Sequence, residues 1–331
     1  MESFKYIDLF AGIGGFRIAL DSVGGRCVYT SEIDQNCREA YVKNFGGSVN
    51  GDIKNENENE VPDHDVLAAG FPCQAFSIAG NKKGFDDARG TLFFEILRVV
   101  KAKSPKVVLM ENVKNLAHHD EGKTLAAISR SLEDLGYKFS WKVLNTADFG
   151  LAQNRERTIM VAAMGNEFDF NPVVATKYKK KTIRDIMEEG PEDKFEFLDP
   201  KEYTIIDEKM WTEQKSGLIF VGYRNKSIRK TGVRPNTEHL SRVHKQPNRI
   251  YHVDGTHPTI PSQESSGRFW IYDGKRVRKL TIRECFSLQG FPRNYKITPI
   301  AGTAYRQIGN SVGVPLIKAV AKQIKKQYLE K

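Results

Sequence analysis

The sequence predicts an α/β protein with a doubly wound, mostly parallel sheet and a second, smaller, irregular β-rich domain. Strands and helices alternate across the first 165 residues, which is typical of a parallel sheet with helices on both faces. A glycine turn and several polar residues follow the ends of these strands, where the crevice of such a sheet lies. From about residue 172, helical periodicity is poor, Gly and Pro are scattered, and basic residues accumulate.

The apolar segments of the first half predict the elements in order. Strands are expected at 4–10, 27–31, 66–69, 107–110, 139–144 and 158–163, with a short strand ending at 51–53. Helices are expected through residue 20, from an Asp34 N-cap to about 45, and over 91–103 and 124–135. Later in the chain we expect a short helix over 281–288. Helical structure is expected again over 304–327, with an amphipathic helix that begins at Gly309-Asn310-Ser311.

Composition excludes several classes of protein. The 331 residues are 40% hydrophobic and 28% charged, which is ordinary for a soluble protein large enough to bury a core. The N-terminus lacks a signal-peptide pattern, and no apolar run has membrane-spanning length. The four cysteines show neither paired zinc spacing nor disulfide density, so we expect no metal and a reducing, cytoplasmic location.

The net charge of +10 is concentrated in the second half. Residues 215–283 hold 15 basic and 4 acidic side chains, interleaved with aromatic residues, which is typical of a surface that faces a polyanion. The alternative is a solvated basic face. The arginines expected to contact this polyanion are Arg224, Arg229, Arg234, Arg249 and Arg268. For each of them a phosphate contact or plain surface is a better interpretation than base reading.

Polar residues at strand ends suggest a nucleoside ligand. The turn over 11–17 lets a ligand approach backbone amides closely, but the third glycine of a dinucleotide fingerprint is replaced by Arg17. Glu32, about twenty residues on, is placed to accept from ribose hydroxyls, and Asp52 could accept from an adenine amino group. Each acid taken alone is better interpreted as a solvated strand end, but the two together are not.

Gly70-Phe71-Pro72-Cys73 presents a cysteine where a buried strand ends. A cysteine at such a site can act as a nucleophile through its thiolate, although most free cysteines are small buried hydrophobes. The following segment, 78–90, is rich in Gly, Lys and Asp, and we expect it to close over a bound substrate. Glu111 ends a second strand on the same side of the sheet.

The ordered set of motifs resembles the DNA (cytosine-5)-methyltransferases of the single-chain bacterial type. The resemblance spans nearly the whole chain except about 172–275. Its motifs are the stretch 8–16, Glu32, Asp52, 70–74, 111–113, 153–157, 283–285 with 289–292, and 305–312. It implies a catalytic and cofactor-binding domain of 1–171 plus 304–331, and a target-recognition domain of 172–303.

The chemistry of these residues agrees with the resemblance. Carbon 5 of cytosine is a poor nucleophile until a thiolate adds to carbon 6, which Cys73 could do. Glu111 could protonate or hydrogen-bond N3, and either Arg155 or Arg157 could hold the base O2. The resemblance favours Arg157 for O2 and Arg155 for supporting the thiolate region. Because the carbon is inaccessible in a duplex, the base must be flipped out.

The resemblance also implies the cofactor S-adenosyl-L-methionine and its contacts. Ile33 stands where some members have an aromatic residue on adenine, which weakens the expected stacking. The implied cofactor residues are Phe10, Gly12, Gly14, Gly15, Glu32, Ile33, Asp52, Ile53, Pro72, Leu92 and Asn310. Further DNA contacts are expected from Gln74, Ser77, Asn112 and Gln153.

The expected partner is double-stranded DNA, with no membrane. A cognate restriction endonuclease is expected as a functional partner, and the chain is expected to be a monomer. One alternative is a tRNA cytosine-5 methyltransferase of the same fold, which the basic insert before Arg283 disfavours. Another is a non-catalytic DNA-binding protein, which the presence of Cys73, Glu111 and both arginines disfavours. A thiol hydrolase is disfavoured because no histidine stands in a context that suggests a base for Cys73.

Overall fold

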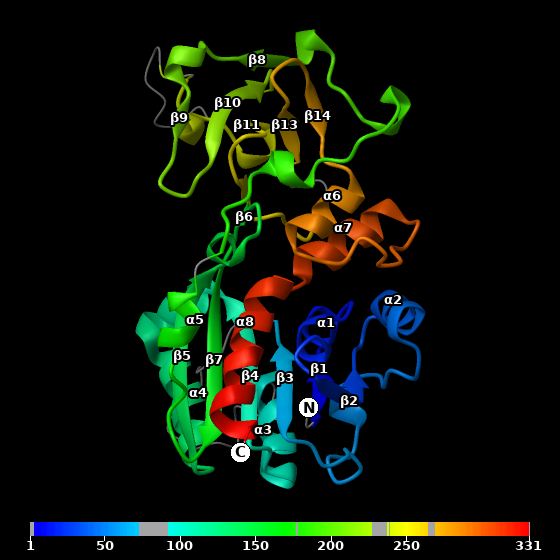
Figure 1. The fold of residues 1–331 in the computed structure, drawn as a ribbon, viewed down its shortest axis with the longest axis vertical. Helices are drawn as coiled ribbons and strands as arrows, with labels where there is room; N and C mark the ends of the chain where they lie inside the picture. The colour runs from blue at the N-terminus through cyan, green and yellow to red at the C-terminus, as the bar shows by residue number, and fades with distance from the viewer. Residues whose placement is uncertain are drawn as a thin grey trace. The chain divides into compact units, whose positions relative to one another are not determined.

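A computed structural model describes residues 3–72, 92–176, 178–226, 237, 239–263 and 269–330. Contacts between residues divide the chain into two units (Figure 1). The larger unit comprises Met1–Asn145, Glu156–Lys177 and Val314–Lys331, and the smaller unit comprises Thr146–Arg155 and Tyr178–Gly313.

The larger unit is built on one mixed sheet. Its strands are β1 (Phe4–Leu9), β2 (Gly25–Ser31), β3 (Val66–Gly70), β4 (Val107–Val113), β5 (Tyr137–Asn145) and β7 (Glu156–Met164). They lie in the order β2-β1-β3-β4-β7-β5. The first four pair in parallel, whereas β7 runs antiparallel to both β4 and β5. The mostly parallel sheet predicted from the strand–helix alternation is confirmed.

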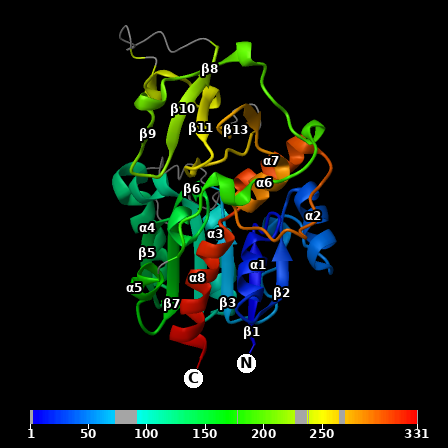
Figure 2. The same ribbon diagram turned by 45° about the horizontal axis from the view of Figure 1, so that its top comes forward.

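Helices pack on both faces of this sheet (Figure 2). They include α1 (Gly15–Asp21), α3 (Leu92–Lys103), α4 (Lys123–Glu133) and α8 (Val314–Ile324). Alternate strand residues such as Ile7 and Leu67 share one buried core with α3 and α4. Tyr6 points the opposite way and hydrogen-bonds Asp21 at the end of α1, which in turn contacts α8. The predicted doubly wound architecture is therefore confirmed.

The region after β2 confirms one prediction and corrects another. Helix α2 (Gln35–Phe45) begins at the predicted N-cap, because Asp34 accepts from the N–H groups of Asn36 and Cys37. The short strand expected to end at 51–53 is instead an isolated bridge between Ser31 and Asn50. Asp52 then caps a 3-10 helix over Ile53–Asn55, so capping turns the backbone out of the sheet.

The C-terminal helix predicted over 304–327 is two helices. The sequence predicted that a helix begins at 309–311. Instead, helix α7 (Ala301–Asn310) ends there, and α8 begins at Val314. Pro315 explains the break, because it has no N–H to continue the helix and its ring clashes with the carbonyl four residues earlier. Helix α6 (Ile282–Leu288) confirms the short helix before it. A further short helix, α5 (Asn171–Ala175), follows β7 in the larger unit.

The smaller unit contains short strands joined by turns and 3-10 helices (Figure 1). They are β8 (Tyr203–Ile205), β9 (Thr212–Glu213), β10 (Ile219–Arg224), β11 (Arg249–His252), β13 (Trp270–Tyr272) and β14 (Val277–Lys279). The sheet order is β14-β13-β11-β10-β8, with β9 paired to β10. A separate parallel pair joins β6 (Gln153–Asn154) to β12 (His257–Pro258). The irregular β-rich region predicted for this part of the chain is confirmed.

The units differ at three places from the domains predicted as 1–171 plus 304–331 and 172–303, and the first is that the larger unit extends to Lys177. The segment Thr146–Arg155 belongs to the smaller unit, where β6 pairs with β12. Residues 304–313 also belong there, because α7 packs against α6. Within the described residues, no helix combines the length and the apolar character that crossing a membrane requires.

Candidate active site

The first strand of the larger unit ends in a tight glycine turn. Gly12 and Gly14 adopt left-handed conformations with φ values of 53° and 84°, and half-buried Phe10 joins them at 55°. A Cβ on Gly14 would lie 2.3 Å from the ring of Phe45, so glycine is required there. Apart from Gly12 itself and its two chain neighbours, no described residue has an atom within 4 Å of the position that a Cβ on Gly12 would take. The turn, from which Gly15 begins α1, therefore presents bare backbone beside open space.

Glu32 links the end of β2 to this turn. Its Oε2 accepts a hydrogen bond from the Gly12 N–H at 2.7 Å, and its Oε1 accepts one from the Asp34 N–H at 2.8 Å. An ionised carboxylate has about four lone-pair sites, so both oxygens can still accept from hydroxyl groups. Two backbone donors thus orient a half-buried carboxylate that retains acceptor capacity. This arrangement suits the ribose contact predicted for Glu32.

The other residues predicted to bind the cofactor differ in their burial. Ile53 is buried in the core and Asp52 is half-buried beside it, at the start of the 3-10 helix. Ile33 is 67% exposed, so its side chain packs on little in this conformation. Half-buried Leu92 begins α3, and exposed Pro72 ends the described part of the preceding segment. Glu32 after β2, Asp52 at the cap of the 3-10 helix and the bare glycine turn after β1 form a donor and acceptor set that fits S-adenosylmethionine.

A buried ion pair lies where the central strands of the larger unit end. Glu111 Oε1 is 2.9 Å from Arg157 Nε, and the two side chains are 11% and 13% exposed. Arg157 also donates through Nη1 to the Glu156 carbonyl at 2.7 Å. In the β3–β4 register Glu111 lies opposite Gly70, three residues before Cys73. A carboxyl group and a guanidinium are therefore held together at the strand end from which the Cys73 segment departs.

Asn112, beside this ion pair, is buried. Its Nδ2 donates to the Phe71 carbonyl at 3.0 Å, and its Oδ1 accepts from the Val113 N–H at 2.8 Å. The sequence predicted a DNA contact for Asn112, but a side chain of a residue that is 2% exposed offers DNA almost no surface in this conformation. Asn112 holds the backbone two residues before Cys73, and its contact with DNA stays a prediction.

Gln153 is also internal rather than exposed to DNA. Its Nε2 donates to the Leu288 carbonyl at 3.1 Å and to Gln289 Oε1 at 3.2 Å, while its Oε1 accepts from the Ile260 N–H at 3.0 Å. The residue has 0% exposed surface. The amide of Gln153 thus makes links within the smaller unit, and its contact with DNA stays a prediction.

Arg155 joins separate segments of the smaller unit. Its Nη2 donates to the carbonyls of Gly309 and Ser311 at 2.9 and 2.8 Å, and its Nη1 reaches the Ile260 carbonyl at 3.4 Å. The side chain thereby holds the turn that contains exposed Asn310. Support of the thiolate region by Arg155 stays a prediction, as does the cofactor contact of Asn310.

Two of the arginines predicted to contact DNA lie in the sheet of the smaller unit. The guanidinium of Arg224 is 4.8 Å from the centroid of the Trp270 ring, a cation–π distance. Arg249 donates through Nε and Nη2 to the His244 carbonyl at 3.2 and 3.1 Å. Both side chains are half-buried at the ends of β10 and β11, and their contact with DNA stays a prediction.

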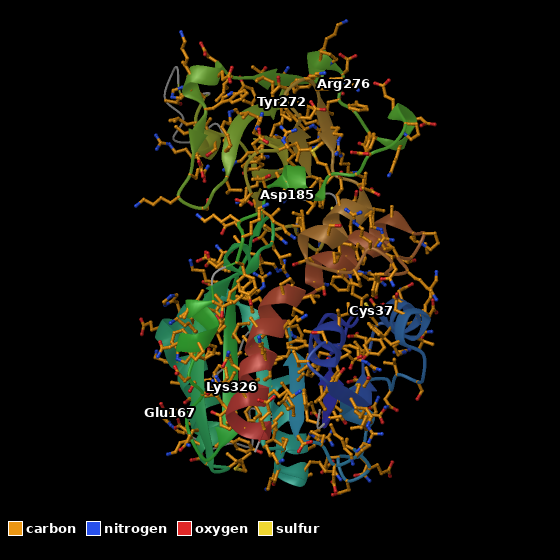
Figure 3. All side chains as sticks on the ribbon, viewed as in Figure 1. Cys37, Glu167, Asp185, Tyr272, Arg276 and Lys326 are labelled. Carbon is orange, nitrogen blue, oxygen red and sulfur yellow. The ribbon has the colours of Figure 1, made fainter. Side chains whose placement is uncertain are left out.

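Several predicted residues lie outside the described part of the chain. These are Cys73, Gln74, Ser77, Arg229, Arg234 and Arg268, together with the segment 78–90. Among the cysteines that the structure describes, Cys285 is buried, and burial raises the pKa of the Cys27 thiol. Cys37 lies on α2 (Figure 3). Burial disfavours the thiolate at Cys27 and so makes it a poor nucleophile.

The sequence analysis missed Arg98 and the part that Gln289 plays. Gln289 belongs to a quoted motif, and its Nε2 donates to the carbonyls of Ile308 and Ser311 at 3.2 and 3.3 Å. Arg98 bonds to carbonyls of the segment 53–60, the acidic run, which contains Glu56, Glu58 and Glu60. The signal that could have found it is a lone arginine on the polar face of a helix, in a chain with a nearby acidic segment.

The chain matches a family model and known proteins over nearly its whole length. A family model described as C-5 cytosine-specific DNA methylase matches residues 4–326. The chain is 42% identical to the Type II methyltransferase M.HhaI of Haemophilus parahaemolyticus, covering 98% of this chain and 95% of that protein. It is likewise 42% identical to the Type II methyltransferase M.NlaX of Neisseria lactamica, covering 97% and 96%. The crystal structure of S. pombe Dnmt2 methyltransferase shares the fold, with a TM-score of 0.69 at 18% identity, over 98% of this chain and 99% of that one.

Proposed function

The chain belongs to the C-5 cytosine-specific DNA methylase family, and we propose that it methylates a flipped-out cytosine within one short sequence of double-stranded DNA. It is a DNA (cytosine-5-)-methyltransferase of the kind found in restriction–modification systems. The observation that carries the residue assignment is the Glu111–Arg157 ion pair. It lies at the strand end that leads to Cys73, where a base must be oriented and a thiolate must attack.

The proposed reaction uses Cys73 as the nucleophile. Its thiolate adds to carbon 6 of cytosine, forming a carbon–sulfur bond and moving electron density toward carbon 5. Glu111 assists by donating a proton or hydrogen bond to N3, and Arg157 holds the base O2 as charge develops there. Carbon 5 would take the methyl group, with S-adenosylhomocysteine as the leaving group. A base then removes the proton from carbon 5, the electrons of that bond expel the thiolate of Cys73, and N3 returns any added proton to Glu111. The bond between the Cys73 sulfur and carbon 6 is thus broken again, and the enzyme is regenerated.

The proposed cofactor is S-adenosyl-L-methionine, which supplies an electrophilic methyl group when bound. Glu32 would accept from its ribose hydroxyls, because two backbone donors already orient the carboxylate. Asp52 would accept from the adenine amino group, and the open backbone at Gly12 lets the ligand approach the turn. Ile33 would make an apolar contact with the adenine, without the stacking that an aromatic residue would add.

Double-stranded DNA is the proposed substrate because the basic residues concentrate in one stretch. Residues 215–283 contain 15 basic and 4 acidic side chains, enough to neutralise several phosphates. We assign the protein to the bacterial cytoplasm as a monomer, with a restriction endonuclease acting on the same sequence. The shared target, rather than a physical contact, would link the two enzymes.

The test is bisulfite sequencing of plasmid DNA from a methylation-free bacterial host that expresses this chain. We expect protected cytosines at one repeated short sequence, and none in cells that express a C73A variant. The C73A protein should still bind DNA and S-adenosylmethionine, because only the nucleophile is removed. Complete conversion of the cytosines, with the wild-type protein folded and abundant, would overturn DNA methylation. Methyl transfer to tRNA by the same preparation would then establish the RNA enzyme instead.

A further inference from the structure

The acidic run after Asp52 is tied down by one arginine of helix α3. Arg98 Nη2 donates to the Ile53 carbonyl at 2.7 Å, and Nη1 donates to the Glu56 carbonyl at 2.9 Å. Nη1 also pairs with the Glu58 carboxylate. One side chain of α3 therefore binds three residues of this low-complexity segment, Ile53, Glu56 and Glu58.

A residue of the same helix orients the guanidinium of Arg98. Its Nε donates to Glu95 Oε2 at 2.9 Å, three residues earlier on α3. A guanidinium is planar, so fixing Nε fixes the directions of the other donors. Two carboxylates offset the charge, and two backbone carbonyls receive the remaining bonds. The side chain is 27% exposed, so solvent screens its charge interactions. Solvent does not change the planar arrangement, or fork, of the guanidinium donors.

The carbonyl that Arg98 holds belongs to the turn of the cofactor site. Asp52 Oδ1 accepts from the Lys54 N–H at 3.1 Å and so starts the 3-10 helix that contains Ile53. On the strand side of the turn, Ser31 donates to the Gly51 carbonyl at 2.7 Å. The turn is thus held from the sheet by Ser31 and from helix α3 by Arg98.

We propose that Arg98 is a positioning residue of the cofactor site, which sets the direction of the Asp52 carboxylate toward the adenine amino group. This inference rests on the proposed function, because Asp52 is assigned to adenine there. Arg98 does not touch the cofactor in this assignment. It acts through the Ile53 carbonyl, one residue from Asp52.

Lys103 provides a matched control on the same helix. Its Nζ donates to the Asn59 carbonyl at 2.9 Å and lies 3.7 Å from Asp63 Oδ1. Lys103 therefore ties the far end of the same acidic run to α3, away from the Asp52 turn. If general loosening of the acidic run were enough to weaken cofactor binding, K103Q would weaken it as well. If Arg98 positions the Asp52 carboxylate, only substitutions of Arg98 should weaken it.

The experiment compares binding by calorimetry for the wild type, R98Q, R98K and K103Q. The ligands are S-adenosylhomocysteine and S-inosylhomocysteine, which replaces the adenine amino group by a carbonyl oxygen. We expect the wild type to prefer the adenosyl ligand, because a carboxylate accepts from an amino group and repels a carbonyl oxygen. R98Q should bind the adenosyl ligand about tenfold more weakly and lose most of the preference. R98K should resemble R98Q, since a lysine has no fork, and K103Q should match the wild type.

Two further readouts separate positioning from loss of folding. In the ligand-free protein, hydrogen exchange over 52–56 should be faster in R98Q than in K103Q, with exchange in β1 and β4 unchanged. At saturating cofactor, kcat should stay within about twofold of the wild type while KM for the cofactor rises. An R98Q or R98K protein that keeps wild-type ligand preference overturns the inference, and so does a K103Q protein that loses it equally. A folded wild type that binds neither ligand overturns the proposed function itself.

Discussion

Glu111 on β4 and Arg157 on β7 are diagonal neighbours on two antiparallel strands, with Oε1 and Nε 2.9 Å apart. In the register, Glu111 lies opposite Ile159 and Val113 lies opposite Arg157. Two-residue spacing places both side chains on the same face of the sheet. The acid assigned to N3 and the cation assigned to the neighbouring O2 of one cytosine are therefore oriented by the sheet before any substrate arrives.

Replacing the acid should affect turnover much more than binding. We expect E111Q to lower the single-turnover methylation rate by about a hundredfold or more, because an amide cannot supply the proton at N3. The dissociation constant for target DNA should change by less than about threefold. The control is K114Q, which breaks the exposed ion pair between Lys114 and Glu156 at 2.8 Å and should leave the rate within about twofold. Equal rate losses in the two variants would contradict the role of Glu111.

Removing the Asn112 amide should destabilise the segment that leads to Cys73. In N112A the buried Phe71 carbonyl loses its donor, which costs about 1–3 kcal/mol of unfolding free energy. Urea unfolding measures this loss, and methylation by N112A should also slow, because the backbone two residues before Cys73 is no longer held. V113A is the neighbouring control, since Val113 is 38% exposed and should cost much less. A stability of N112A equal to that of V113A would show that the bond contributes nothing.

Two glycines of α7 should respond oppositely to alanine. A Cβ on Gly309 would lie 2.2 Å from the Pro261 carbonyl oxygen, so G309A forces two backbone segments apart. A Cβ on Gly302 meets nothing among the described atoms within 4 Å, so G302A should stabilise the helix by up to about 1 kcal/mol. Thermal unfolding of both variants tests this, with a lowered Tm for G309A alone. A raised Tm for G309A would mean that the close approach to Pro261 is absent.

Burial of Asp8 makes stability depend on pH. Burial raises the pKa of this carboxyl well above its usual range, and the charges of Glu32 and Asp21 add to the rise while that of Arg17 opposes it. A raised folded-state pKa favours the protonated form, so its contribution to stability is complete below pH 4 and is lost as pH rises toward the folded pKa. Asp8 Oδ1 has no hydrogen-bond partner among the described atoms, which agrees with a neutral carboxyl.

The D8N variant should remove this pH dependence. Above about pH 4 the wild type loses up to about 1.4 kcal/mol of unfolding free energy per pH unit from this group, whereas an amide loses none. Urea unfolding at several pH values from 5 to 8 should show an advantage of D8N that grows with pH. A difference between the two proteins that is constant across this range would mean that Asp8 is ionised throughout.

Local patterns were enough to predict most of the larger unit. Apolar runs and turn residues located its strands to within a few residues, and Asp34 marked the start of α2, because strand burial and helix capping are decided by near neighbours in the chain. The ordered motifs identified the family, which the comparisons confirm. Pro315 also marks the helix break before α8 in the sequence, but the predicted helical stretch 304–327 included this residue.

The sequence by itself determined the fold class, the family and the types of residue that the chemistry needs. Only the tertiary structure decided which of those side chains remain accessible. Asn112 and Gln153 look like exposed polar residues beside a catalytic motif, yet both are buried because their amides satisfy backbone groups of distant segments. Arg98 donates to carbonyls 42 and 45 residues away. Such pairings follow from how elements pack, and no local spacing encodes them.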